Sequence, residues 1–275
     1  MAIDWLGLRS NLRLAVPRAA FLLTILLVVG AAGVAQEKPR VVHVFVALAD
    51  NDHQGIVPVP RVLGNGDDEQ RNLYWGAAFG VRTFFKRSIE WKEGARRENP
   101  TPVVLQRVVF YCAARDVYLI ADAYRGREIR QSIADFFSAA AGQWESEPVR
   151  VATSQGQAAE IADTPSLVVY VGHDGLMDFA MGKQFAGDRN GKRQAVMLAC
   201  ASKNYFGAGL RVTGAEPVLW TTGLMAPEAY TLKATLDAWM AGGSGDQIRK
   251  EAARAYARYQ KISERAALQL FATGW

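Results

Sequence analysis

Short apolar runs rich in β-branched residues recur along the chain, separated by polar or glycine-containing segments. Such runs are typical of strands that are covered on both faces of a sheet. They occupy residues 41–49, 103–112, 117–124, 167–171, 195–199 and 218–222. The first run (VVHVFVALA) is almost wholly apolar, which predicts a central strand of a parallel sheet. The second and third runs form either a hairpin or two successive strands.

Other segments carry apolar residues at helical spacing, at residues 72–87, 126–141, 227–240 and 246–270. A glycine-rich break at residues 242–245 separates the last two. Residues 50–70 are polar and contain several Gly and Pro residues, which predicts a long loop at the exit of the first strand, a position that is often functional. Strands that alternate with helices predict an α/β domain with a mostly parallel sheet.

The first 35 residues have the pattern of a secretory signal peptide. Three arginines precede an apolar run at residues 19–29, and small residues follow at 30–35. The apolar stretch is at the short limit for a membrane span, so we expect cleavage near Ala35, no stable membrane insertion afterwards, and a periplasmic or secreted protein. An uncleaved anchor is the alternative interpretation. The mature chain, residues 36–275, is then expected to form a single α/β domain.

Charge and composition narrow the function classes. The signal segment contains three Arg and one Asp, so its removal lowers the formal net charge from +5 to +3. The remaining basic residues are scattered among acidic and apolar ones, as on solvated helix faces, and this pattern argues against nucleic-acid binding. Half of the chain is hydrophobic, which is enough for a sizeable core. Its two cysteines, Cys112 and Cys200, could form one disulfide in an oxidising compartment.

Chemically versatile residues follow two of the predicted strands. Residues 167–171 run into Gly172, His173, Asp174 and Gly175, and residues 195–199 run into Cys200. If the two strands are parallel neighbours, His173 and Cys200 emerge side by side at one edge of the sheet. A thiolate there can attack a carbonyl carbon while the imidazole protonates the leaving amine. Glycine at 172 and 175 lets the backbone approach a substrate, and backbone N–H groups at this edge, including that of Cys200, could bind an oxyanion.

The two blocks SLVVYVGHDG and QAVMLACAS, about 27 residues apart, resemble those of caspase-like cysteine peptidases, the group of metacaspases, clostripain, gingipains and CHAT domains. In these families a catalytic His follows one hydrophobic strand and a catalytic Cys follows the next. The resemblance implies a caspase-like three-layer αβα sandwich and an exported endopeptidase that acts on peptides or proteins without a cofactor. His173 would be the general acid and base, and Cys200 the nucleophile. One departure is Asp174, which stands between the His and the Gly that usually follows it directly.

Acidic residues near the presumed site are candidates for substrate binding. In the caspase-like families an acidic residue near the end of the first strand often binds a basic substrate side chain, a role that Asp50 or Asp52 could fill here. A turn built from Asp and Asn side chains around His53 is the alternative. Asp174 could orient His173 or contact substrate. We predict no metal site, because the three His residues are isolated and no Cys cluster is present.

Two rival interpretations remain open. The chain could be a catalytically inactive caspase-like homologue that acts as a binding protein. It could also be an envelope protein of unrelated α/β fold in which Cys112 and Cys200 form a disulfide, which requires their Cα atoms to lie within about 7 Å of each other. If no disulfide forms, Cys112 is expected to be a buried core thiol.

Overall fold

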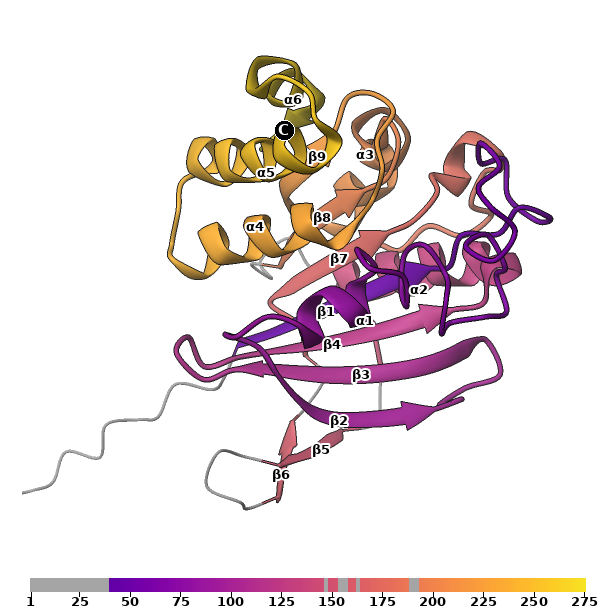
Figure 1. Ribbon diagram of the computed structural model, residues 1–275, viewed down its shortest axis with the longest axis vertical. Helices are drawn as coiled ribbons and strands as arrows, with labels where there is room; N and C mark the ends of the chain where they lie inside the picture. Colours follow the sequence, from indigo (N-terminus) through magenta and orange to yellow (C-terminus); the bar gives the residue numbers. More distant parts are fainter. Residues whose placement is uncertain (1–39, 146–147, 153–157, 162–163, 188–192) are drawn as a thin grey trace, which may run out of the picture. The chain divides into compact units, whose positions relative to one another are not determined.

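The computed structural model describes residues 40–145, 148–152, 158–161, 164–187 and 193–275. The predicted signal peptide and its cleavage site near Ala35 lie outside the described residues. Eight strands form one sheet in the order β10-β9-β8-β7-β1-β4-β3-β2 (Figure 1). Five neighbouring strands are mutually parallel: β1 (Arg40–Ala47), β4 (Val117–Tyr124), β7 (Leu167–Val171), β8 (Gln194–Leu198) and β9 (Glu216–Thr221). The predicted α/β class with a mostly parallel sheet is confirmed.

The remaining strands are antiparallel. β2 (Lys92–Glu98) and β3 (Val104–Cys112) extend one side of the sheet, and β10 (Phe271–Ala272) pairs with β9 at the other. β3 and β4 form the hairpin, one of the two arrangements that the sequence allowed. A separate two-stranded sheet is formed by β5 (Val149–Ala152) and β6 (Ala158–Ile161).

Helices cover both faces of the sheet, consistent with the predicted three-layer arrangement (Figure 1). Alternate residues of β1 enter two different cores: Val44 and Val46 face one, Phe45 and Ala47 the other. The first core is covered by α1 (Val81–Lys86), α4 (Ala229–Met240), α5 (Gly245–Gln260) and α6 (Glu264–Leu270). The second is covered by α2 (Ile129–Ala141) and α3 (Ser202–Thr213). Because β1 is covered on both faces and paired on both sides, almost every residue in it is apolar.

Several elements differ from the prediction. The helix expected at residues 72–87 is limited to the short α1, and turns precede it. The Asn72 side chain forms hydrogen bonds with the backbone of Ala49, and the backbone packs too closely at Gly76 and Gly80 for a longer helix. The single helix expected at 246–270 is two, divided at Lys261, whose φ of 55° ends α5. A capping box of Ser244 and Gln247 explains why α5 begins directly after the glycine-rich break. Two further helical segments are 3₁₀ turns: η1 (Gly126–Glu128) and η2 (Gly175–Met177).

The order of the strands places a topological switch point between β1 and β7. From β1 the chain passes to the hairpin and β4 on one side, and then returns through α2 to β7 on the other side. The direction of strand addition therefore reverses between β1 and β7, and ligands of open α/β sheets bind outside the carboxyl ends of strands at such a point. None of the described helices has the length and apolar character needed to cross a membrane.

Candidate functional site

His173 and Cys200 follow the carboxyl ends of neighbouring parallel strands in matched register. Val171 of β7 pairs with Leu198 of β8, and the N–H of Gly172 donates to the Leu198 carbonyl at 3.2 Å. Each functional residue lies two positions beyond its member of that pair, and adjacent strands are about 4.8 Å apart. The expectation that the two strands are parallel neighbours is confirmed. Within the described part of the chain, however, no hydrogen bond joins the imidazole to the thiol.

The His173 ring is held by a carboxylate. Its Nε2 lies 2.6 Å from Oδ2 of Asp178, five residues along the chain, at the C-cap of η2. The His173 side chain is only 8% exposed, and its backbone carbonyl accepts a hydrogen bond from the buried Tyr170 hydroxyl at 2.7 Å. Ring and backbone are therefore both fixed, and Nδ1 remains as the ring nitrogen for other partners. Asp178 was not among the residues that the sequence singled out.

The Cys200 thiol is half-buried and lies against the loop that follows β9. Its Sγ is 3.4 Å from the backbone N of Met225 and 3.5 Å from the carbonyl oxygen of the same residue. Burial raises the pKa of Tyr74 well above its usual value, and the neighbouring Cys200 contributes to that shift. Tyr74 belongs to the core covered by α4 and α5, so the thiol faces that side of the sheet.

The residue after Cys200 has a strained backbone. Ala201 has a φ of 46°, a left-handed conformation that costs a residue with a Cβ about 1–2 kcal/mol. Its N–H donates to the Gly223 carbonyl at 2.8 Å, and the next N–H, that of Ser202, donates to Thr221 Oγ1 at 3.1 Å. These bonds fix a tight turn from β8 into α3. Strained residues of this kind concentrate at functional sites, which supports a role for Cys200.

Replacing Ala201 with glycine is expected to leave the free energy of unfolding unchanged or to raise it by up to about 1 kcal/mol, because glycine adopts the left-handed conformation without a Cβ penalty. The matched change Ala266→Gly, at an exposed position inside α6, should lower it by about 1 kcal/mol. Urea unfolding monitored by circular dichroism measures both. An equal loss in the two variants would show that the turn at Ala201 is not strained.

The backbone N–H groups of the two glycines that were expected to help bind an oxyanion already donate hydrogen bonds to backbone carbonyls. The N–H of Gly172 continues the sheet ladder to Leu198, and the N–H of Gly175 donates to the His173 carbonyl at 3.1 Å. Neither donor is open in this conformation. Among the described residues, none accepts a hydrogen bond from the N–H of Asp174 or of Cys200. These two backbone groups, one beyond each strand, are open donors at this edge.

Asp174 is fully buried next to His173. Its Oδ1 accepts a hydrogen bond from the Leu176 N–H at 3.0 Å, which caps η2. Its other oxygen, Oδ2, is buried without a hydrogen-bond partner among the described residues. Burial raises the pKa of this carboxyl to about 7, and the nearby Asp178 contributes. The side chain does not reach the surface, so contact with a substrate would require the loop to move.

The acidic residues after β1 build a turn. Oδ1 of Asp50 accepts from the backbone N–H groups of Asp52 and His53, and Oδ2 lies 2.9 Å from Nδ1 of His53. Asp50 is 4% exposed and packs so closely on Gly126 that a Cβ there would lie 2.3 Å from the Asp50 Cβ. This is the Asx turn that the sequence offered as the alternative to a substrate-binding role. Asp52 is the exposed carboxylate of the pair.

The two cysteines are free and lie at opposite edges of the sheet. Cys112 pairs in register with Val117, which is level with the first residue of β1. Cys200, in contrast, lies at a level beyond the carboxyl end of β1. Eight residues of strand separate these levels, or roughly 25 Å. A disulfide within the chain is therefore impossible in this fold, which removes the basis of the disulfide-stapled interpretation. Cys112 is buried, as expected of a core thiol.

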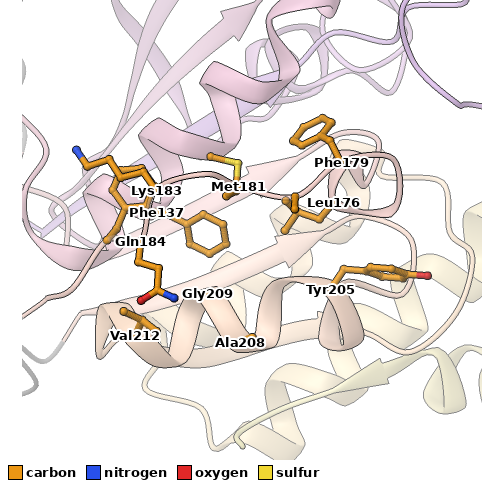
Figure 2. Close-up of a pocket in the computed structure, with 12 residues that line it drawn as sticks. Phe137, Leu176, Phe179, Met181, Lys183, Gln184, Tyr205, Ala208, Gly209 and Val212 are labelled. Carbon is orange, nitrogen blue, oxygen red and sulfur yellow. The ribbon is translucent and has the colours of Figure 1, made fainter.

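An apolar groove runs along α3 on the face opposite the Cys200 thiol. Figure 2 shows Leu176, Phe179 and Tyr205 at one end and Gln184 and Val212 at the other. Its volume is about 380 Å³, and neither His173 nor Cys200 lines it. α3 packs closely here, because a Cβ at Gly209 would lie 2.7 Å from the Phe137 ring. The groove was not predicted, although its apolar residues between 176 and 185 are visible in the sequence.

No protein-family model, no curated protein and no solved structure matches this chain. Within the residues that the structure describes, no group of three or more His, Cys, Asp or Glu side chains is arranged to hold a metal ion.

Proposed function

We propose that this chain is an exported caspase-like cysteine endopeptidase in which Cys200 and His173 form the catalytic dyad. The observation that carries the proposal is the matched register of β7 and β8, because it brings the residues after two parallel strands to the same level of one sheet edge. The resemblance of the blocks GHDG and LACAS to the family assigns the same two residues. The strained turn after Cys200 is a third, independent support.

The reaction would proceed through a thioester. His173 accepts the Cys200 proton, and the sulfur attacks the scissile carbonyl carbon. The tetrahedral oxyanion is stabilised by open backbone N–H groups, for which those of Asp174 and Cys200 are the candidates. The C–N bond then breaks, and the imidazolium protonates the leaving amine. Water, activated by the same imidazole, hydrolyses the thioester and regenerates the thiol. No metal or cofactor enters these steps.

Asp50 is a weaker candidate for binding a basic substrate side chain than the sequence suggested. Because its carboxylate is occupied by the turn, recognition of a basic side chain would fall to Asp52, or to Asp174 after a loop movement. A peptide segment that reaches across the sheet edge is the substrate class that the open ends of β1, β7 and β8 accommodate.

A non-catalytic binding protein is the second candidate, and one observation favours it. His173 is hydrogen-bonded to Asp178 and Cys200 to the Met225 backbone, so each member of the dyad has a partner other than its counterpart. Catalysis requires that the thiol leave Met225 and meet Nδ1 of His173.

We expect the purified mature protein, under reducing conditions, to cleave members of a mixed peptide library, because a reduced thiol and an imidazole that follow neighbouring parallel strands can perform acyl transfer once the sulfur meets Nδ1. Mass spectrometry of the digest measures cleavage, and a sample pretreated with iodoacetamide is the control. Alkylation of Cys200 should abolish cleavage. A library left intact by protein with two reduced, unmodified thiols would favour the binding protein instead.

A further inference from the structure

The hydrogen bond between His173 and Asp178 assigns the two ring nitrogens different tasks. An ionised carboxylate only accepts hydrogen bonds, so at 2.6 Å from Oδ2 the Nε2 of His173 must carry a proton. In the neutral imidazole Nδ1 is then the basic nitrogen. No other side-chain hydrogen bond to this ring is formed within the described part of the chain, so Asp178 alone sets the tautomer.

We propose that Asp178 is the positioning residue of His173 and that the loop after β1 holds it in place. This inference rests on the proposed peptidase function. Asp178 fixes the proton on Nε2 and directs the basic Nδ1 toward the reaction. When Nδ1 takes the thiol proton, the ring becomes a cation, and the adjacent carboxylate stabilises that charge until the proton passes to the leaving amine. Carboxylates that hydrogen-bond metal-bound imidazoles typically contribute about 10–100-fold to metal affinity or activity, and we take this as the scale for Asp178.

The two neighbouring carboxylates have separate tasks. Asp174 is buried and caps η2 through the Leu176 N–H, and among the described residues no hydrogen bond joins its carboxyl to the imidazole. Asp178 is 43% exposed and reaches the ring from the far end of η2. The 3₁₀ turn η2 thus reverses the chain, so that the carboxylate of Asp178, five residues after His173, lies against the imidazole.

Gly55 connects the long loop to this arrangement. A Cβ built on Gly55 would lie 2.8 Å from Oδ1 and 3.1 Å from Oδ2 of Asp178, so the loop backbone packs directly against the carboxylate. The loop is itself anchored, because the side chain of Gln54 donates to the carbonyls of Leu48 and Gly126 at 2.9 and 2.8 Å. The loop at residues 50–70 therefore limits the positions open to Asp178 and, through it, to the His173 ring.

The kinetic test compares Asp178→Asn, Asp178→Glu and Gly55→Ala with the control Asp237→Asn, which removes an equally exposed carboxylate on α4. We expect Asp178→Asn to lower kcat about 10–100-fold with KM within about twofold, because the imidazolium formed during the reaction loses its counter-charge. Asp178→Glu should restore part of kcat, and Gly55→Ala should lower it by displacing the carboxylate. A kcat of Asp178→Asn equal to that of Asp237→Asn, or higher than wild type, would overturn the proposal.

A second measurement does not depend on activity. The chain has only three His, so ¹⁵N-labelled imidazoles can be assigned by substitution in a Cys200→Ala background. We expect His173 to be the Nε2–H tautomer, and to become a mixture of tautomers in Asp178→Asn. An Nδ1–H tautomer, or spectra that do not change with the substitution, would show that Asp178 does not set the ring. If the tautomer is as expected and no peptide is cleaved, the peptidase proposal fails while the positioning of His173 by Asp178 stands.

Discussion

Cys200→Ala is expected to abolish peptide hydrolysis, with a loss in kcat of at least about 10³-fold, and to abolish labelling by a thiol-reactive peptide probe. Removing the nucleophile removes the covalent route altogether, and in related chemistry such changes cost up to about 10⁶-fold. His173→Ala should lose nearly as much, and the double variant little more than either single one, because the dyad acts as a unit.

Cys112→Ala is the matched control for this prediction. It removes the other thiol of the chain, which lies at the opposite sheet edge and is 2% exposed, so hydrolysis and probe labelling should both persist. Initial rates on the best library peptide and intact-protein mass after labelling provide the two measurements. Comparable losses in the Cys112 and Cys200 variants, or full hydrolysis by Cys200→Ala, would exclude the assignment of Cys200 as nucleophile.

Asp174→Asn is expected to stabilise the protein at pH 8 by about 2 kcal/mol. Burial raises the pKa of this carboxyl to about 7 from an ordinary value of 3.8. Below about pH 4 the carboxyl is protonated in both the folded and the unfolded chain, so burying it carries no cost of ionisation and the free energy of unfolding is highest with respect to this group. Between about pH 4 and pH 7 the unfolded chain ionises while the folded one does not, so the free energy of unfolding falls as pH rises. The expected gain is smaller than the full shift in pKa would produce, because solvent near the exposed Met177 screens part of the effect.

The variant isolates this effect. Asparagine keeps an oxygen that can accept from the Leu176 N–H and cannot ionise, so its stability should depend less on pH. Urea unfolding at several pH values from 4.5 to 8 should give two curves that diverge as pH rises, whereas Asp237→Asn should run parallel to the wild type. Parallel curves for Asp174→Asn would mean that the buried carboxyl does not retain its proton in the folded state.

The central strands could be predicted because burial on both faces leaves almost no choice of residue, as in β1. β2 could not, because its sequence KEGARRE is that of a solvated edge strand, and a charged run alone does not distinguish strand from loop. α3 was missed for a different reason. Its glycines lower helix propensity, but Gly209 is required by the close approach of the Phe137 ring, a tertiary contact that no local pattern contains.

For the candidate site, the positions of the two main residues could be predicted from the sequence, but the partners of their side chains could not. Parallel pairing alone brings the ends of β7 and β8 together, so His173 and Cys200 could be placed from strand ends and connection rules. The partners of their side chains could not be placed in this way. Asp178 reaches His173 only because η2 turns the chain back, and Asp50 is withdrawn into a turn whose hydrogen bonds depend on the path of the following loop.

Because the two thiols are unequally buried, their rates of chemical modification report on two different properties of the protein. A reagent reaches Cys200 in the native state, so the rate of its modification reports on the occupancy of the sheet edge. The Cys112 thiol is enclosed by the core, and its reaction requires an opening of the β3–β4 hairpin. One alkylation time course therefore follows ligand binding and fold integrity at the same time, each through its own cysteine.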